Sequence, residues 1–321
     1  MIITPIELQK QKNDFTIVDI RSDQQRNEFP LKGIDTVIAT EKGIHKISGK
    51  KVLVCQFGIV TEGIILENDM ENTFSLLGGA QAWIEFQSDK EDLSQWSRQT
   101  VLPEIGIEGQ KKLLNATVAI IGMGGLGCPA AQSLMSAGVG KLKLIDGDMV
   151  ELSNLHRQPL YGVDDVNRLK VEVAKERLEQ LNKNAVIESI DEYFNKENGL
   201  SIVRDSDIVI DATDNIQTRQ LIDRFSKEAN VPMVYGGLFR YEGQVAVLNV
   251  NGSPGYSDLF PDPPSNGETC EDAGVLGMLP GIIGNIQALE AVKLIVGMKH
   301  NLNGKLLIYD GLTHNTQIFQ L

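Results

Sequence analysis

One glycine-rich loop, Gly122-Met123-Gly124-Gly125-Leu126-Gly127, constrains the fold of this chain more than any other feature. An apolar run over 117–121 predicts a buried strand that leads into the loop. A helix is expected directly after the loop, with Pro129 in its first turn and Gly138 at its end. A second strand is predicted over 141–146. Because backbone N–H groups at a helix N-terminus can approach a phosphate, this β-loop-α-β unit predicts a nucleotide-binding site.

Asp146 ends the second predicted strand and lies 19 residues after Gly127. A dinucleotide-binding fold places its ribose-binding acid at about this distance from the glycines, roughly 20 residues on. The spacing supports a ribose and leaves both NAD and ATP open. A tight strand-to-helix turn that binds no ligand is the structural alternative.

Charged residues beyond Asp146 favour a triphosphate over a dinucleotide. Arg157 and Lys170 can neutralise phosphate oxygens, the arginine through its planar fork and the lysine as a point charge. Asp214 follows another apolar strand, 208–210, at the end where a Mg²⁺ ligand would face the same crevice. Each residue alone could be a solvated ion pair or a helix cap. Together they favour a nucleotide site.

Several motifs between Leu93 and Leu321 resemble the ThiF/MoeB family of adenylyltransferases, which are related to ubiquitin-activating enzymes. The motifs are Ser97-Arg98-Gln99, the glycine loop with Cys128, Asp146-Gly147-Asp148, Ser153-Asn154-Leu155-His156-Arg157-Gln158, Lys170, Thr213-Asp214-Asn215 and Arg240-Tyr241-Glu242-Gly243-Gln244-Val245. The resemblance implies ATP-dependent adenylation of the C-terminal Gly-Gly carboxylate of a ubiquitin-like sulfur-carrier protein. The acyl-adenylate would then be converted to a thiocarboxylate for molybdopterin or thiamine biosynthesis.

The resemblance also assigns roles to individual residues and implies a homodimer. The expected ATP-binding residues are Gly122, Gly124, Gly125, Gly127, Asp146, Asp148, Asn154, Arg157, Gln158, Lys170, Asp214 and Asn215. Among them Arg157, Lys170 and Asp214 are expected to be catalytic, and Asp214 to bind Mg²⁺. Arg98 is expected to reach the triphosphate held by the neighbouring subunit.

Residues 1–88 predict a separate, small α/β domain that resembles a rhodanese, a sulfurtransferase domain that carries sulfur as a cysteine persulfide. The matching pieces are Val-Asp-x-Arg around Asp19, Cys-x-x-Gly-x-x-Thr beginning at Cys55, and Leu-x-Gly-Gly-x-x-x-Trp ending at Trp83. A cysteine at a strand end meets backbone N–H groups that favour its thiolate. Val60 stands where rhodanese loops usually carry an arginine. A persulfide carrier, supplied by a cysteine desulfurase-type donor, and a degenerate domain with a buried cysteine both stay open.

Two expectations concern residues 255–270. Many relatives hold a structural zinc between two Cys-x-x-Cys pairs, but this chain has Gly255 and Asp258 at the first pair and shows no second pair. Because tetrahedral zinc normally takes four Cys or His ligands, no zinc site is predicted. Cys270 matches a position where some relatives bond the carrier covalently. Its acidic neighbours would raise its pKa, so a catalytic role for Cys270 is one of two open interpretations.

Composition bounds the remaining possibilities. A chain of 321 residues with 42% hydrophobic content can form two domains, assigned to 1–88 and 89–321. The predicted fold is α/β, a Rossmann-like domain with a mixed, largely parallel sheet after the rhodanese-like domain. A net charge of −13 argues against a nucleic-acid partner. Three cysteines and no apolar run of membrane length favour a cytoplasmic protein without a membrane partner.

The order of elements after the glycine unit is also predicted. A helix over 168–181, strands over 186–190, 207–211, 233–235 and 244–250, a buried helix ending at 296 and a terminal hairpin over 305–310 and 316–321 are expected. Three other functions compete with carrier adenylation. They are an NAD(P)-dependent dehydrogenase, a non-catalytic docking scaffold and the adenylation of a different carboxylate.

Overall fold

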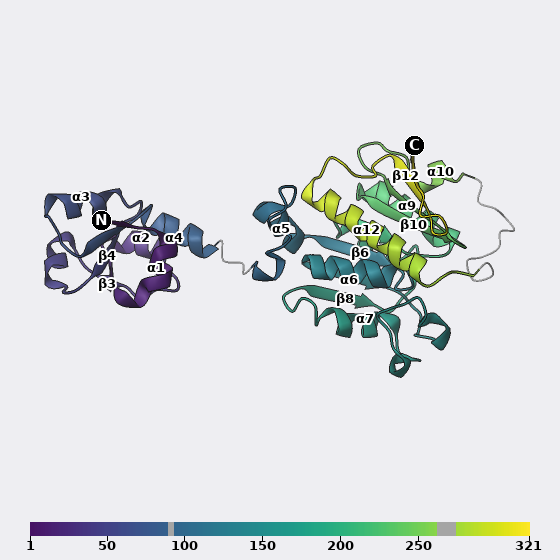
Figure 1. Ribbon diagram of the computed structural model, residues 1–321, viewed down its shortest axis with the longest axis horizontal. Helices are drawn as coiled ribbons and strands as arrows, with labels where there is room; N and C mark the ends of the chain where they lie inside the picture. The colour runs from purple at the N-terminus through teal and green to yellow at the C-terminus, as the bar shows by residue number, and fades with distance from the viewer. Residues whose placement is uncertain (89–92, 262–273) are drawn as a thin grey trace. The chain divides into compact units, whose positions relative to one another are not determined.

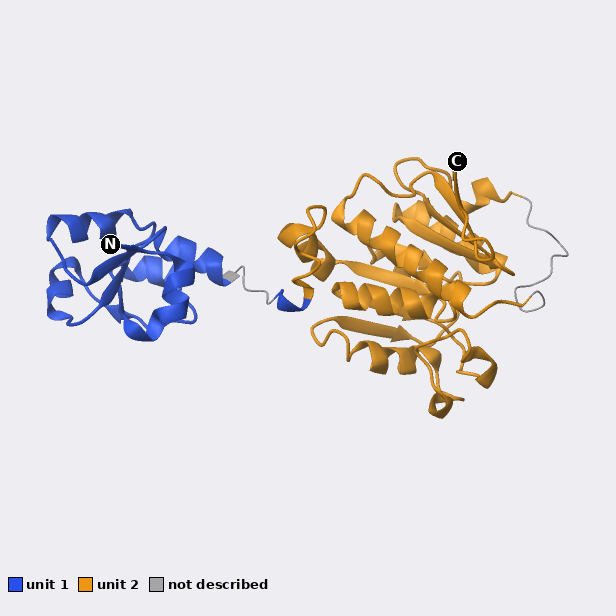
Figure 2. Cartoon of the chain, in the orientation of Figure 1, with its two compact units in different colours: residues 1–95 blue, residues 96–321 orange. Residues whose placement is uncertain are grey.

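The computed structural model describes residues 1–88, 93–261 and 274–321, and these form two compact units. The first unit is Met1–Gln95 and the second is Trp96–Leu321 (Figure 2). Each unit has its own sheet and its own apolar core, so each is described by itself.

The first unit contains a five-stranded parallel sheet in the order β1-β5-β4-β2-β3. Its strands are β1 (Ile2–Ile3), β2 (Thr16–Asp19), β3 (Val37–Ile38), β4 (Lys51–Val54) and β5 (Thr73–Leu76). Its helices are α1 (Pro5–Gln11), α2 (Asp23–Glu28), α3 (Ile59–Glu67) and α4 (Gly79–Ser88), with 3-10 turns η1 (Lys12–Asp14) and η2 (Glu41–Lys46). Cys55 directly follows β4, the central strand.

Local signals explain why the short helices of this unit begin where they do. Thr4 and Ser22 each cap a helix through a reciprocal pair of hydrogen bonds with the residue three positions on, the arrangement that satisfies free N–H groups. Apolar clusters lie on both faces of the sheet. Trp83 is fully buried in one of them, and its indole N–H donates to Lys32 O at 3.0 Å. A β-branched-rich strand such as β4 is therefore covered on both sides, as a parallel sheet requires.

The second unit is built on an eight-stranded sheet in the order β13-β12-β11-β10-β9-β6-β7-β8. The parallel strands are β6 (Thr117–Ile121), β7 (Lys141–Ile145), β8 (Val186–Ile190), β9 (Ile208–Asp211) and β10 (Met233–Phe239). The antiparallel strands are β11 (Glu242–Leu248), β12 (Lys305–Asp310) and β13 (Thr316–Gln320). The mixed, largely parallel sheet of the sequence prediction is confirmed. The strand order reverses between β6 and β9, where open α/β sheets bind their ligands.

Helices cover both faces of this sheet (Figure 1). The helices are α5 (Gly106–Asn115), α6 (Gly127–Ala137), α7 (Lys170–Leu178), α8 (Gly199–Arg204), α9 (Ile216–Ala229), α10 (Tyr256–Leu259) and α12 (Met278–Val296), with 3-10 turns η4 (Leu152–Asn154) and η5 (Val163–Asp165). The 3-10 turn η3 (Ser94–Trp96) crosses the division between the two units. Helices α5, α6, α7 and α12 share one core, and α8, α9 and α10 share the other. Three layers result, as in a Rossmann-like fold.

Helix α12 is the longest of the described helices and passes a membrane-span test on length and composition alone. Its packing identifies it as a core helix. It lies beside α6 over β10 and β11 (Figure 1), and half of its most apolar stretch of 18 residues is buried inside the protein. Gln287 and Glu290 are buried polar residues on this helix that hydrogen-bond to neighbouring protein groups. The prediction of a buried helix in this region is confirmed.

The boundaries of β10 and β11 differ from the sequence prediction. Strand β10 continues four residues beyond Tyr235, to Phe239, and β11 spans Glu242–Leu248 instead of 244–250. Gly236 and Gly237 weaken the strand signal in the sequence because glycine has low strand propensity. Pairing with β11 over seven residues keeps them in the ladder.

Candidate functional site

The glycine loop joins β6 to α6 and leaves three consecutive N–H groups free. The backbone N–H groups of Gly124, Gly125 and Leu126 make no hydrogen bond within the described parts of the chain. Gly122 has a φ of 96°, and a Cβ on Gly127 would lie 1.9 Å from Gly122 O. Glycine is therefore required at both ends of the loop for it to close this tightly. Free N–H groups at the start of a helix are an anion-binding arrangement.

An acid-base cluster adjoins the loop at the end of β7. Asp146 Oδ2 accepts from the Met123 N–H at 2.7 Å, which ties the acid to the glycine loop. Lys170 Nζ lies 2.8 Å from Asp148 Oδ2 and 4.0 Å from Asp146 Oδ2. Burial raises the pKa of Asp146, and Lys170 opposes that rise. Burial also acts to raise the pKa of Asp148, but hydrogen bonds from Lys170 and Tyr193 outweigh it and lower that pKa.

Tyr193 is a member of this cluster that the sequence analysis missed. Its hydroxyl donates to Asp148 Oδ1 at 2.6 Å, and its ring lies against Gly147, where a Cβ would be 3.0 Å from the ring. The side chain is nevertheless exposed. Its position three residues after the predicted strand 186–190, at the same sheet edge as Asp146, is the signal that could have indicated it.

The segment after β7 brings two more of the predicted residues to the loop. Gln158 is buried, and its Nε2 would lie 3.5 Å from a Cβ placed on Gly124. Arg157 Cγ would lie 3.6 Å from a Cβ on Gly125, and its Nη1 donates to Ser153 O at 3.0 Å. Among the described residues Gln158 Oε1 has no hydrogen-bond partner. An unpartnered buried oxygen beside free N–H groups indicates a site that a polar ligand completes.

Two predicted ATP-binding residues have structural hydrogen bonds of their own. Asn154 Oδ1 accepts from the Glu151 N–H at 3.2 Å and so closes the η4 turn. Asn215 Oδ1 accepts from the Thr218 N–H at 2.8 Å and caps α9. A contact with ATP through these oxygens would compete with the caps.

Asp214 lies in the turn after β9, three residues beyond the last residue of the strand and close to the glycine loop. It is exposed and makes no hydrogen bond or ion pair with another residue in the described ranges. The turn that carries it touches the loop, because a Cβ on Gly122 would lie 2.6 Å from Ala212 O. Mg²⁺ is commonly held by one or two carboxylates together with substrate phosphates and water. An exposed, unpaired carboxylate beside a phosphate loop fits that requirement.

Arg98 stands apart from this group. The segment that carries it is attached where Trp96 Nε1 donates to Ser136 O at 2.9 Å, near the C-terminal end of α6. The glycine loop lies at the N-terminal end of α6, and an 11-residue helix is about 16 Å long. Arg98 is exposed and makes no hydrogen bond or ion pair in the part of the chain that the structure describes. The structure therefore does not bring Arg98 to the site of its own subunit.

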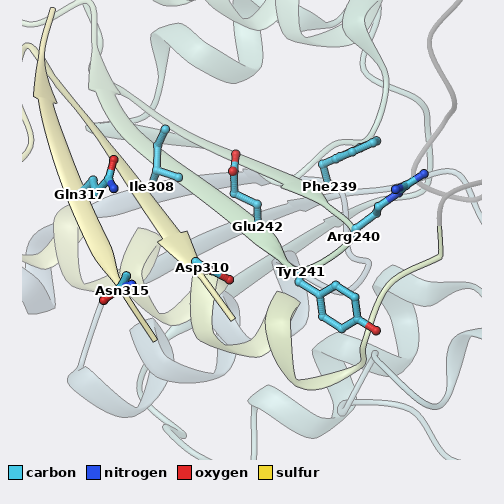
Figure 3. Close-up of a pocket in the computed structure, with 8 residues that line it drawn as sticks. All are labelled: Phe239, Arg240, Tyr241, Glu242, Ile308, Asp310, Asn315 and Gln317. Carbon is cyan, nitrogen blue, oxygen red and sulfur yellow. The ribbon is translucent and has the colours of Figure 1, made fainter. Parts of the chain in front are cut away.

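Two hollows lie elsewhere on the second unit, and neither is lined by the glycine loop. One, of about 470 Å³, lies between the β10–β11 turn and the β12–β13 hairpin (Figure 3). The other, of about 650 Å³, is lined by residues such as Lys112, Asp207 and Pro232, at the opposite edge of the sheet. The phosphate site is therefore indicated by the free N–H groups of the glycine loop and the charges around them.

Cys55, in the first unit, lies in a turn that favours its thiolate. The Gly58 N–H donates to Cys55 Sγ at 3.1 Å, and the Thr61 hydroxyl lies 3.5 Å from the same sulfur. Burial acts to raise the pKa of the Cys55 thiol, but the hydrogen bonds from Thr61 and neighbouring loop N–H groups outweigh it and lower that pKa. Val60 is exposed, and the loop 56–61 contains no cationic side chain.

Alkylation should distinguish Cys55 from Cys128. In a Cys270→Ser background, iodoacetamide should modify Cys55 with a half-maximal rate below pH 9.0, the ordinary thiol value, because its pKa is lowered. Cys128 should stay unmodified, because burial raises its pKa to about 12. Mass spectrometry of the modified peptides across a pH series measures both rates. A Cys55 midpoint at or above pH 9.0 would contradict the hydrogen-bonded thiolate.

The remaining predictions on residues 255–270 fall partly outside the structure. Cys270 lies outside the described residues. At the expected first zinc pair, Asp258 Oδ2 accepts from the Gly255 N–H at 2.9 Å, which caps the short helix α10. Among the described residues no group of three or more His, Cys, Asp or Glu side chains could hold a metal ion. The absence of zinc stays a prediction.

Comparison with known proteins decides the family. Residues 96–321 match the ThiF family. The chain belongs to the ThiF family. A relative from Thermus thermophilus, named sulfur carrier protein adenylyltransferase, is 43% identical over 230 residues, which are 70% of this chain and 85% of that protein.

A further relative and a solved structure are also similar to this chain. Adenylyltransferase and sulfurtransferase MOCS3 from Drosophila sechellia is 42% identical over 79% of this chain and 55% of that protein. The chain spans about half the length of several such MOCS3 relatives. The crystal structure of PaaA superposes with a TM-score of 0.61 at 28% identity, covering 72% of this chain and 74% of that one. This similarity confirms the α/β fold predicted from the sequence.

Proposed function

We propose that this protein uses ATP to adenylate the C-terminal carboxylate of a ubiquitin-like sulfur-carrier protein. The observation that carries the proposal is the meeting of three free loop N–H groups, Lys170 and the unpaired Asp214 at one sheet edge. ThiF-family membership and the names of the Thermus and Drosophila relatives support the same reaction. The product carboxyl-adenylate would prepare the carrier for thiocarboxylate formation in molybdopterin or thiamine biosynthesis.

The chemistry asked of the site is positioning and charge neutralisation. A C-terminal carboxylate is ionised at neutral pH, so no general base is needed for its attack on the α-phosphorus of ATP. Pyrophosphate leaves, and the negative charge that builds on it must be stabilised. The loop N–H groups, Arg157 and Lys170 are assigned to that task, because Arg157 lies beside Gly125 and Lys170 lies beside Asp148. Asp146 is assigned to the ribose, and each of its oxygens keeps a lone pair free after accepting one N–H.

Asp214 is assigned to Mg²⁺. The metal would neutralise phosphate charge when bound with the nucleotide. A site with one exposed carboxylate suits an ion that arrives with ATP, whereas a resident metal would need a fuller protein cage.

The groove at the β10–β11 turn is assigned to the carrier (Figure 3). It opens at the carboxyl end of β10, the same sheet edge as the glycine loop. Glu242 lies directly opposite Asp310 in the antiparallel ladder, and neither makes an ion pair with a described residue. Like charges placed opposite one another are unfavourable, so a basic side chain of the carrier would relieve them.

A homodimer is proposed because Arg98 is too far from its own site to act there. Exposed apolar residues on α12, including Met278 and Leu289, offer a surface that a second subunit could cover. A cytoplasmic location stays a prediction from the cysteine content.

The decisive test of the proposal is ATP–pyrophosphate exchange assayed with purified Gly-Gly-ending carrier proteins. Exchange that depends on a carrier and on its free C-terminal carboxylate is expected. Carriers blocked by C-terminal amidation are the matched control. Exchange with none of the carriers, together with stabilisation by NAD but not by ATP in a thermal-shift assay, would favour a dehydrogenase.

The first unit is proposed to be rhodanese-like and to supply sulfur from a persulfide on Cys55. The hydrogen bonds that lower the pKa of Cys55 support this role. A cysteine desulfurase-type protein is the proposed donor, because the loop offers no cation for a small anionic one. The word sulfurtransferase in the name of the MOCS3 relative agrees with a combined function.

Cys55→Ser is expected to abolish carrier thiocarboxylate formation and to leave pyrophosphate exchange within about twofold of the wild type, because the proposed adenylation step does not use Cys55. Mass spectrometry of the carrier, which detects replacement of one oxygen by sulfur, gives the first measurement. Thr36→Ser, on the loop before β3, serves as a control in the same unit. Unchanged thiocarboxylate formation in Cys55→Ser would remove the persulfide role.

A further inference from the structure

A buried cluster beneath Asp214 is not used by the chemistry described above. Asp211 ends β9 with its side chain fully buried. Its Oδ1 accepts from the Thr213 N–H at 3.0 Å and from the Thr213 hydroxyl at 2.7 Å. These two bonds fold residues 211–213 into a tight turn, and Asp214 is the next residue along the chain.

Arg219 closes the other side of this turn. It lies one turn into α9, and its Nη2 donates to Thr213 O at 2.6 Å and to Gly236 O at 3.1 Å. Its Nε is 3.4 Å from Asp211 Oδ2, and its guanidinium lies over the Tyr235 ring, 5.2 Å from the centroid. One guanidinium therefore connects α9, the turn and β10.

Gln287 fixes the cluster from the opposite face of the sheet. It is fully buried on α12, and its Nε2 donates to Asp211 O at 2.7 Å and to Val234 O at 3.1 Å. A Cβ on Gly236 would lie 2.4 Å from this side chain, so the strand approaches the amide closely. Both faces of the sheet thus hold the end of β9 in place.

Stability alone does not account for this arrangement. The desolvation free energy of a buried ion pair can cancel the free energy of attraction between its charges. A protein with apolar residues in place of the pair is therefore often as stable. Asp211 Oδ2, Arg219 Nε and Gln287 Oε1 are also buried without a hydrogen-bond partner in the described part of the structure. The benefit is local, because the turn that they hold contacts the glycine loop through Ala212 O and Gly122.

We propose that Asp211 and Arg219 are positioning residues that hold the Thr213–Asp214 turn against the glycine loop, so that Asp214 meets the metal–nucleotide complex already oriented. The inference rests on the proposed function and assigns the selectivity for metal-bound ATP to this cluster. Residues that orient a metal ligand typically change metal affinity by about 10- to 100-fold when replaced. A residue that only supports the fold would weaken binding of metal-bound and metal-free ATP alike.

The test is calorimetric binding of ATP to the full chain, in Mg²⁺ and separately in EDTA. Arg219→Lys keeps the charge but loses the fork, and it should weaken binding in Mg²⁺ by about tenfold while changing binding in EDTA by less than about threefold. Thr213→Val, which removes one hydrogen bond to Asp211, should show the same selectivity with a smaller effect. In the Arg219→Lys/Thr213→Val double variant, the change in binding free energy should differ from the sum of the two single changes, because both substitutions act on one turn.

Arg224→Lys is the matched control, since Arg224 is exposed on the same helix. It should leave both affinities unchanged. If Arg219→Lys does not fold, as judged by circular dichroism, Thr213→Val alone decides the question. Equal weakening in Mg²⁺ and EDTA, or no weakening, would overturn the positioning role. A wild-type chain that binds no ATP in either buffer would instead refute the proposed function on which the inference rests.

Discussion

Replacing Lys170 with methionine is expected to lower carrier-dependent pyrophosphate exchange by about 10²-fold or more, the usual cost of removing a preorganised charge from a transition state. Lys170 is only 6% exposed, and it is the cation nearest to both Asp146 and Asp148. Without it, Asp146 and Asp148 would face the triphosphate without their lysine partner. The exchange rate at saturating ATP is the measurement, and KM for ATP is expected to rise as well.

The control for this substitution separates charge from folding. Lys183→Met removes an exposed lysine of the same unit and should leave exchange unchanged. Lys170→Arg keeps the charge and should recover part of the activity. Loss of the Lys170 contact should also raise the pKa of Asp148, because that hydrogen bond helps to lower it. Exchange within about threefold of the wild type in folded Lys170→Met protein would contradict the assigned role.

Arg98→Ala is expected to reduce exchange by on the order of 10³-fold, the lower end of the range for an arginine supplied to a phosphoryl-transfer site. The structure places Arg98 near the far end of α6 from its own glycine loop, so the contribution expected of it would come from the partner subunit of the proposed homodimer. The decisive measurement is complementation. Inactive Arg98→Ala and Lys170→Met chains, mixed and allowed to exchange subunits, should regain activity.

The expected recovery follows from symmetry. Equal mixing makes half of the dimers mixed, and each mixed dimer has one site with an intact Lys170 and an intact Arg98 from its partner, so about a quarter of the wild-type activity should return. Mixing Arg98→Ala with wild-type-like Lys183→Met controls for the exchange procedure. No recovery in a mixture shown to contain mixed dimers would place Arg98 outside the site.

The sequence predicted the frame of the site well because the signals were local. Apolar runs, the glycine loop and Gly138 set β6, α6 and β7 almost to the residue. The carboxyl ends of parallel strands meet at one edge, so Asp146 and Asp214 could be predicted to lie together. The strand limits near Gly236 could not be predicted, because pairing between β10 and β11 there overrides the low strand propensity of glycine.

The sequence by itself determined the family resemblance, the order of strands along the chain and the charged residues proposed for the site, since each of these depends on neighbours along the chain. Only the tertiary structure decided which of those residues are free to meet a ligand. It engages Asn215 in a helix cap, pairs Lys170 with Asp148 and separates Arg98 from its own glycine loop. It also brings Arg219 and Gln287 beneath Asp214. These are contacts between segments distant in sequence, and no local pattern encodes them.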